Sequence, residues 1–213
     1  MANADTHYVY IPQHKLFVKR VFDIAASLFG ITVLFPVLAV IALCVGLSST
    51  GGVLFRQVRV GRQGKEFKVL KFRTMISGAP AAGPQITAIG DLRVTKVGGI
   101  LRKTKLDELP QLFNVLFGDM SFVGPRPEVP KYVEMYSEEQ RAVLSIRPGI
   151  TDPASIRFRD ESEILAGSKD PEKMYIEEIM PAKLSLNLAY LQNIGLFGDI
   201  KIIFATFARI IKS

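Results

Sequence analysis

Residues that commonly bind metal ions or form disulfides are scarce in this chain of 213 residues. It has one cysteine, Cys44, and two histidines, His7 and His14, which both lie near its beginning. One cysteine cannot form an intramolecular disulfide or a thiolate cluster, and these two histidines do not supply the ligand set of a zinc site. By default a single cysteine is a buried, inert thiol, which is what we expect of Cys44.

Charged residues are missing from residues 24–47. A straight helix of this length would extend about 36 Å, which is enough to cross a bilayer. Pro36 divides the segment into halves of about 18 Å each, and neither half alone could cross. The segment is also longer than the apolar part of a cleaved signal peptide, so we do not expect cleavage.

Basic residues flank this apolar segment on both sides. Lys15, Lys19 and Arg20 precede it, and the residues that follow it are Arg56, Arg59, Arg62, Lys65, Lys68 and Lys71. Basic flanks favour the cytoplasmic side. A re-entrant helix that breaks at Pro36 satisfies both flanks and is the favoured prediction. A kinked spanning helix stays open, because the longer flank could set the orientation alone. Ser27 or Thr32 could bond the backbone groups that the break sets free.

The formal net charge of +7 raises the question of an anionic partner. The basic and aromatic residues show no recognition-helix or RNP-like pattern, so we expect no nucleic acid partner. Anionic lipid headgroups and a pyrophosphate substrate explain the excess better. The sequence shows no internal repeat and no extended low-complexity tract.

Two strands are predicted after the apolar segment, at 53–60 and 65–75, with a turn at 61–64. Alternation along the second strand places Lys71 and Arg73 on one face, where both could point at one anion. The alternative is a solvated sheet edge. Residues 78–84 read as a turn-rich loop, which could cover a site.

The rest of the chain reads as mainly helical. Helical pattern begins near residue 94, restarts near 107, ends around 118, and returns at 137–145 and 168–190, with an irregular stretch at 122–130. Asp199 is the expected N-cap of a final helix whose apolar residues are Ile200, Ile203, Phe204, Phe207 and Ile211. This helix could pack on the core of its own domain or lie on a membrane surface.

Two adjacent carboxylates, Asp107 and Glu108, form the leading candidate site. Pro110 is tolerated only in the first turn of a helix, so we expect a helix to begin near Leu106 or Asp107. Both carboxylates then lie at the positive end of the helix dipole, which also favours phosphate. Nearby cations are Arg93, Lys96, Arg102, Lys103, Lys105 and Arg126. The alternatives are ordinary first-turn charges or a structural ion-pair network.

The motifs of this chain resemble those of the bacterial sugar transferases that act on polyprenyl phosphate, the small monotopic phosphoglycosyl transferases. The matching segments are 19–23, 71–75, 91–95, 101–102, 106–112, 118–127 and 147–151. With the patterns above, we expect an α+β, mainly helical monotopic membrane protein with a short β-hairpin. Its expected parts are an N-terminal segment (1–19), a re-entrant membrane helix (20–50), a cytoplasmic catalytic domain (51–198) and an amphipathic interfacial helix (199–213).

The resemblance implies a reaction at the cytoplasmic face of the bacterial inner membrane. A sugar 1-phosphate would pass from a UDP-sugar to polyprenyl (undecaprenyl) phosphate with release of UMP. The partners implied are these two substrates and membrane lipids, and a homo-oligomer stays open. Two rival readings are a membrane-anchored scaffold that binds without turnover and a phosphohydrolase without a lipid acceptor.

The same resemblance assigns roles to individual residues. Asp107 would be the nucleophile and Glu108 would help to hold Mg²⁺. Arg102 would hold a phosphate, Lys71 and Arg73 would line the site, and Arg126 would meet the nucleotide or its phosphates.

The chain departs from the pattern of many relatives at two places. Phe35-Pro36 stands where they have Ser-Pro, so a serine hydroxyl is missing at the break. Asp152-Pro153-Ala154 stands where they have Gly-Trp-Ala, and this difference leaves the sugar unassigned.

Overall fold

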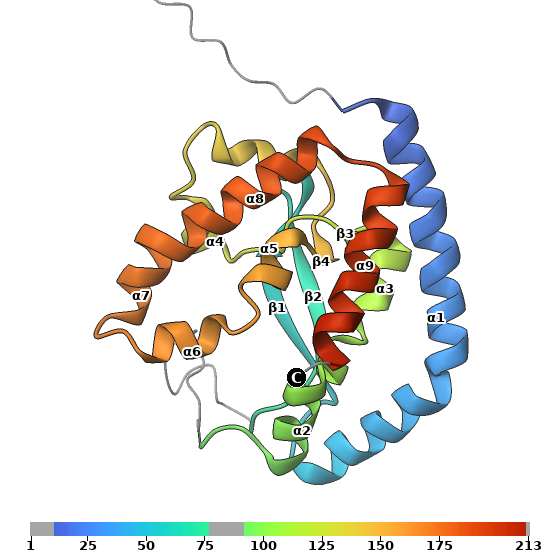
Figure 1. Ribbon diagram of the computed structural model, residues 1–213. Helices are drawn as coiled ribbons and strands as arrows, with labels where there is room; N and C mark the ends of the chain where they lie inside the picture. The colour runs from blue at the N-terminus through green and yellow to red at the C-terminus, as the bar shows by residue number, and fades with distance from the viewer. Residues whose placement is uncertain (1–10, 77–91, 212–213) are drawn as a thin grey trace, which may run out of the picture.

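The protein, seen as a computed structural model in which residues 11–76 and 92–211 are described, is mainly helical and has two small sheets. A long helix, α1, runs along one side of a body built around a two-stranded hairpin (Figure 1). The helices are α1 (Gln13–Ser48), α2 (Lys96–Thr104), α3 (Gln111–Phe117), α4 (Pro130–Val133), α5 (Pro153–Arg157), α6 (Glu161–Ala166), α7 (Pro171–Met174), α8 (Met180–Gln192) and α9 (Leu196–Ile211). The strands are β1 (Leu54–Val60), β2 (Glu66–Phe72), β3 (Ser121–Val123) and β4 (Gly149–Thr151). The predicted mainly helical α+β character is confirmed.

β1 and β2 form the predicted antiparallel hairpin, with Leu54 opposite Phe72. The turn between them contains Gln63 and Gly64, whose φ angles of 59° and 74° are positive. β2 ends at Phe72 instead of residue 75, because the backbone beyond it pairs with another segment. The carbonyl of Thr74 accepts a hydrogen bond from the Thr95 amide (3.0 Å), just before α2. The hairpin is thereby tied to α2.

β3 and β4 form a parallel pair that joins two of the sequence motifs. Ser121 lies opposite Gly149, and Val123 opposite Thr151. The backbones approach so closely that a Cβ at Gly149 would lie 2.2 Å from the nitrogen of Gly124, so a side chain at 149 would force the strands apart. The pairing places the segment 125–127 next to the residues that follow β4.

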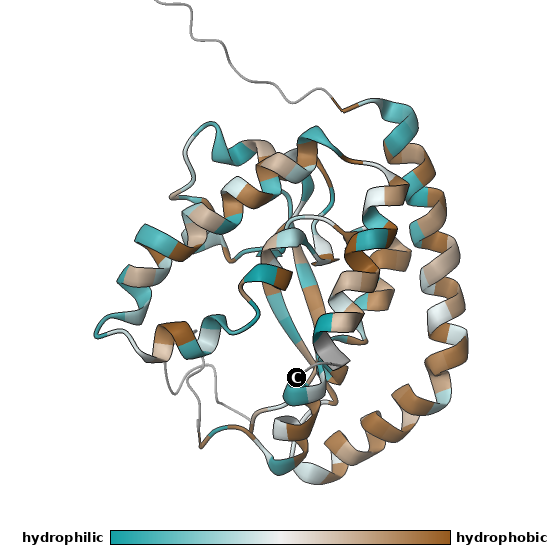
Figure 2. Ribbon diagram, in the orientation of Figure 1, coloured by the Kyte–Doolittle hydropathy of each residue, from teal (hydrophilic) through white to brown (hydrophobic). Residues whose placement is uncertain are grey.

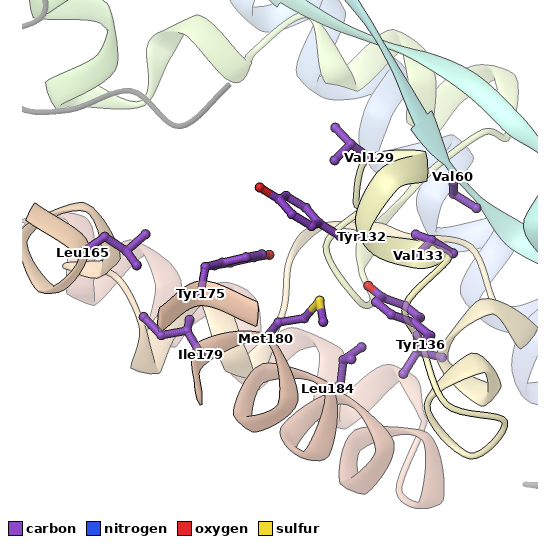
Figure 3. Close-up of a cluster of buried hydrophobic side chains, with 11 residues drawn as sticks. Val60, Val129, Tyr132, Val133, Tyr136, Leu165, Tyr175, Ile179, Met180 and Leu184 are labelled. Carbon is purple, nitrogen blue, oxygen red and sulfur yellow. The ribbon is translucent and has the colours of Figure 1, made fainter. Parts of the chain in front are cut away.

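Two buried clusters hold the body together. Figure 3 shows the first, in which Val60 of β1, Tyr132 of α4 and Met180 of α8 converge. In the second, Ile202 and Ile203 of α9 pack on a cluster formed by Ile11, Val123, Ile146, Tyr190, Leu191 and Ile194. The first cluster fixes the segment after β3 between the hairpin and α8, and the second attaches α9 to the body.

The side of α1 that faces the body carries two stripes of buried residues, one in each half of the helix. Its buried residues are Lys19, Asp23 and Ser27 in the first half, and Leu38, Ile41 and Val45 in the second. Each set follows helical spacing, so it occupies one face. The first stripe is polar and the second is apolar.

The polar stripe has partners on the body. Lys19 Nζ donates to Asp199 Oδ2 at 2.6 Å, and this ion pair is almost completely buried. Asp23 Oδ1 accepts hydrogen bonds from Ser121 Oγ and from the Phe122 amide, both at 3.1 Å. The first half of α1 is therefore bound through charges to α9 and β3.

The apolar stripe packs on the other end of the body. Leu38, Ile41 and Val45 share a buried cluster with Phe72 of β2 and Leu101 of α2. α1 thus contacts the body on both sides of Pro36.

Figure 1 shows that α1 bends, and Pro36 is the residue inside it that explains the bend. Proline lacks the amide hydrogen, and its ring clashes with the carbonyl of residue 32. Ser27 Oγ donates to the Ile24 carbonyl (3.1 Å) and Thr32 Oγ1 to the Leu28 carbonyl (2.9 Å). Neither hydroxyl therefore bonds the carbonyl that Pro36 leaves without its donor, contrary to the prediction.

The outer face of α1 is apolar, as Figure 2 shows most clearly for the part beyond the bend. Phe29, Phe35 and Leu47 are 70%, 65% and 81% exposed. By length and composition α1 could cross a membrane. Cys44 is exposed on this helix, so the prediction of a buried thiol is wrong: the apolar neighbours that would bury it face outward with it.

α9 begins at Leu196, which precedes the predicted boundary at 199. Asp199 lies in its first turn and binds Lys19 and the Tyr190 hydroxyl (2.6 Å). The prediction that Asp199 caps this helix is therefore wrong, because its carboxylate neutralises a buried lysine instead. Phe204 and Phe207 are 69% and 59% exposed, so α9 has apolar residues on its outer side as well.

Candidate active site

Asp107 and Glu108 lie in a single 3₁₀ turn, Leu106–Glu108, between α2 and α3. Lys105, with a left-handed φ of 59°, ends α2 and redirects the chain. A helical turn therefore begins at Leu106, as predicted, but it is a 3₁₀ turn. The α-helix α3 begins only at Gln111, with Pro110 as its cap residue, so the predicted start does not hold for α3. A proline with helical φ fits the cap position as well as the first turn. The two carboxylates thus precede α3 by about one turn.

Glu108 is held by two cations from different parts of the chain. Its Oε1 lies 2.7 Å from Lys71 Nζ of β2 and 2.5 Å from Arg126 Nη2, which follows β3. The Glu108 side chain is only 13% exposed. Burial opposes ionisation, yet Arg126 and Lys71 outweigh it and hold the pKa of Glu108 well below its usual range. Glu108 is therefore a fixed anion, and the predicted possibility of an ion-pair network is observed here.

Asp107 has the opposite electrostatic environment. It is 8% exposed, and burial together with the negative charge of Glu108 raises its pKa. Lys71, Lys105 and Arg102 act against this rise. Neighbouring carboxylates whose pKa values are pushed apart are suited to different chemical roles. The more basic Asp107 is the better nucleophile or base, and Glu108 is the better permanent charge.

Arg126 is fixed in its Pro125-Arg126-Pro127 turn by the parallel strand pair. Its amide donates to Asp152 Oδ2 (3.2 Å) and its Nη1 to the Ile150 carbonyl (3.3 Å). The charge of Glu108 raises the pKa of Arg126, so the guanidinium stays protonated. The structure thus brings Arg126 and Lys71 together at Glu108, as two of the four expected substrate-binding residues.

Arg73 takes a different direction from Lys71. Its Nη2 donates to the Ser49 carbonyl (2.6 Å), with the Val45 carbonyl at 3.5 Å, at the C-terminal end of α1. The expectation that Lys71 and Arg73 point at one anion from one strand face is wrong. β2 ends at Phe72, so the strand alternation does not extend to Arg73.

Arg102 belongs to α2 and is oriented by the segment after β2. Its Nε donates to Thr74 Oγ1 at 2.8 Å. A Cβ at Gly98 would lie 2.1 Å from the Thr74 carbonyl oxygen, so glycine is what lets α2 approach this closely. The charge of Arg102 reaches Asp107 and helps to lower its pKa.

Two buried residues position the site although the sequence patterns did not single them out for it. Asp152 is fully buried, caps α5 through the Ser155 amide (2.6 Å), and holds the Arg126 amide. Asn114 of α3 accepts from the Leu70 amide (3.0 Å) and donates to the Lys68 carbonyl (2.9 Å), which ties α3 to β2. The Asp152-Pro153 pair is a helix-start signal that could have indicated the first role.

The side chains at this turn can be compared with the ligands that a magnesium ion needs. Within the two described ranges, no group of three or more His, Cys, Asp or Glu residues could enclose a metal. Magnesium often takes only one or two protein carboxylates and completes its shell with water and substrate phosphates. Glu108 Oε2 has a longer contact, 3.5 Å to Arg126 Nη1, and Asp107 is adjacent in sequence. The donor set therefore fits a magnesium ion bound together with phosphate.

The residues expected at 78–84, and Asp91 of the matching segment 91–95, lie outside the described residues. The site above therefore consists of the turn with Asp107 and Glu108 and the basic residues from β2, α2 and the segment after β3.

Comparison with known proteins places this site in context. The family model described as "Bacterial sugar transferase" matches residues 14–213. A UDP-N-acetylgalactosamine-undecaprenyl-phosphate N-acetylgalactosaminephosphotransferase of Aeromonas hydrophila is 36% identical over 198 residues, which are 92% of this chain and 44% of the relative. A UDP-glucose:undecaprenyl-phosphate glucose-1-phosphate transferase of Klebsiella pneumoniae is 41% identical over 88% of this chain and 39% of the relative. The exopolysaccharide production protein PSS of Rhizobium leguminosarum bv. phaseoli is 40% identical over 90% of this chain and 94% of the relative. The chain thus spans less than half of the first two relatives and nearly all of the third.

Proposed function

The chain belongs to the bacterial sugar transferase family, and we propose that it transfers a sugar 1-phosphate from a UDP-sugar to undecaprenyl phosphate, with release of UMP. The observation that carries this proposal is the Asp107–Glu108 turn, where Glu108 pairs with Lys71 and Arg126 at 2.7 and 2.5 Å and the buried Asp107 lies beside it. The two relatives named for a reaction both act on undecaprenyl phosphate, but they differ in the sugar. The proposal therefore leaves the sugar open.

In the first step, an oxygen of Asp107 attacks the phosphorus that carries the sugar. The bond from this phosphorus to the bridging oxygen breaks, and UMP leaves with the bonding electrons. The product is an acyl phosphate that joins Asp107 to the sugar 1-phosphate. Burial of Asp107 favours the step, because a poorly solvated, more basic carboxylate oxygen is a stronger nucleophile.

In the second step, a phosphate oxygen of undecaprenyl phosphate attacks the same phosphorus. The bond to Asp107 breaks, which restores the carboxylate and gives undecaprenyl-diphosphate-sugar. Because UMP has already left, the two substrates can use the same set of phosphate-binding cations in turn.

The basic residues reduce the repulsion between an anionic nucleophile and an anionic diphosphate. Lys71 and Arg126 already converge on Glu108, and Arg102 lies close enough to influence Asp107. Fixed cations in a largely buried site interact more strongly with developing charge than they would in water. We therefore propose that Lys71, Arg102 and Arg126 bind the phosphates.

We further propose that Glu108 would hold Mg²⁺, since its Oε2 has only a long contact, 3.5 Å to Arg126 Nη1. A magnesium ion supplies charge stabilisation at transferred phosphoryl groups. Glu108 is suited to hold it because the carboxylate stays ionised.

The contacts of α1 support a re-entrant topology. One end of α1 is bound to the body through Lys19 and Asp23, and the other through Val45 and the backbone contact of Ser49 with Arg73. Two ends bound to the same body lie on the same side of a membrane, so α1 would dip into one leaflet and return. We propose that this side is the cytoplasmic face of the bacterial inner membrane, with the outer side of α9 at the interface.

A direct test uses the purified chain with a panel of UDP-sugars and Mg²⁺, with and without undecaprenyl phosphate. UMP release together with a lipid-linked sugar is expected for one sugar. UMP or sugar phosphate release without a lipid product would indicate a phosphohydrolase. No release from any sugar would favour a binding scaffold. Asp170→Asn, at an exposed helix cap where asparagine also fits, is the control for Asp107→Asn.

A further inference from the structure

The C-terminal end of α1 lacks a positive charge of its own. Its last turn contains no basic residue, and Ser49 follows in extended conformation. The last carbonyls of a helix have no partner within the helix and carry the negative end of its dipole. A cation supplied from elsewhere therefore stabilises this end.

Arg73 supplies this charge. Its Nη2 lies 2.6 Å from the Ser49 carbonyl oxygen and 3.5 Å from that of Val45. The backbone reinforces the contact, because the Arg73 amide donates to the Val53 carbonyl (2.9 Å) just after the helix. Arg73 therefore binds the end of the membrane-facing helix to the end of β2.

The same short segment of chain holds the candidate active site. Lys71 binds Glu108 and Thr74 binds Arg102, on either side of Arg73. A shift of this segment relative to α1 would therefore move both the carboxylate and a phosphate-binding arginine. Displacements of about 1 Å in such groups can cost up to about 100-fold in rate.

We propose that Arg73 is a positioning residue that couples the position of α1 on the body to the geometry of the Asp107–Glu108 turn. It acts through the end of the helix and not by binding the UDP-sugar. This inference rests on the proposed function for its catalytic consequence, whereas the helix contact stands independently of that function.

The test compares Arg73→Gln and Arg73→Lys with wild type in lipid nanodiscs. Arg56→Gln is the matched control, since Arg56 is an exposed arginine on the neighbouring strand. Hydrogen exchange of the amides at 45–49 is expected to be about tenfold faster in Arg73→Gln, because a charge-assisted bond is lost. Arg73→Lys should recover part of the protection, and Arg56→Gln should match wild type.

Kinetics provide the second readout. In Arg73→Gln, kcat for transfer to the lipid should fall by about tenfold or more, while KM for the UDP-sugar stays within about twofold of wild type. Unchanged exchange at 45–49 would overturn the proposal. A KM raised tenfold with normal exchange would also overturn it and make Arg73 a substrate ligand. If wild type acts on no UDP-sugar, the proposed function fails, while the exchange measurement still decides whether Arg73 holds α1.

Discussion

Replacing Lys19 by methionine should destabilise this protein strongly. Lys19 and Asp199 form an ion pair of 2.6 Å whose side chains are 7% and 0% exposed. In Lys19→Met, Asp199 keeps the Tyr190 hydroxyl as a donor but loses its countercharge. Removing one partner of a buried ion pair costs about 3–5 kcal/mol, because the other charge is left uncompensated.

This free energy predicts a measurable fall in thermal stability. For domains of this size, each kcal/mol corresponds to about 2–4 °C in Tm, so we expect Lys19→Met to lower Tm by about 6–20 °C. Far-ultraviolet circular dichroism in one detergent can follow the transition, and it suits a chain without tryptophan.

Two further variants identify the cause. In the double variant Lys19→Met with Asp199→Leu, the unpaired charge at Asp199 is removed, so part of the lost stability should return. The recovery should be incomplete, because Tyr190 loses the acceptor of its hydroxyl and Asp23 loses the nearby charge of Lys19. Lys15→Met changes an exposed lysine of the same helix and should shift Tm by no more than about 2 °C. If Lys19→Met also stayed within this limit, the binding of α1 to the body through buried charges would be refuted.

Three other predictions concern catalysis and topology. Asp107→Asn should leave the protein folded but abolish UMP release, and turnover at the wild-type rate by this variant would remove Asp107 from the nucleophile role. Wild type mixed with its UDP-sugar alone should gain the mass of a sugar phosphate on the peptide that contains Asp107. Because burial and a neighbouring carboxylate raise the pKa of Asp107, the ionised nucleophile is lost earlier as the pH falls. In a plot of the UMP burst rate against pH, the midpoint of the acidic limb should therefore lie above the usual aspartate pKa of about 3.9. A midpoint at or below this value would contradict the assignment of Asp107 as the nucleophile. Single cysteines near Thr6 and Ser168, in a Cys44→Ser background, should both resist an impermeant thiol reagent in intact cells. Adding Pro36→Ala should straighten α1 and favour labelling of the cysteine near Thr6. An unchanged labelling pattern would mean that the contacts at both ends of α1 hold the bend.

Local sequence signals predicted the parts of the fold that local interactions determine. The hairpin could be predicted because two apolar-rich segments flank a glycine-containing turn. The bend in α1 could be predicted because Pro36 interrupts an uncharged segment. The end of β2 at Phe72 could not be predicted from the sequence, since it depends on the hydrogen bond between Thr95 and Thr74. This bond is a contact of the tertiary structure.

The candidate site shows the same division. Asp107, Glu108, Lys71 and Arg126 were identified from motifs, but their pairing requires β2 and the segment after β3 to meet at one turn. The direction of Arg73 could not be predicted, because the helix end that it binds lies in a different part of the sequence. The partners of Lys19 and Asp199 were equally hidden by their separation along the chain.

That separation has a consequence for biosynthesis. Lys19 lies in the first described helix, and its countercharge follows 180 residues later. While the ribosome is still making the intervening chain, α1 carries a lysine, an aspartate and a serine on a face that has no partner yet. The buried ion pair between α1 and the body can therefore form only after α9 has been synthesised, so the docking of α1 on the body is a late event in the maturation of the protein.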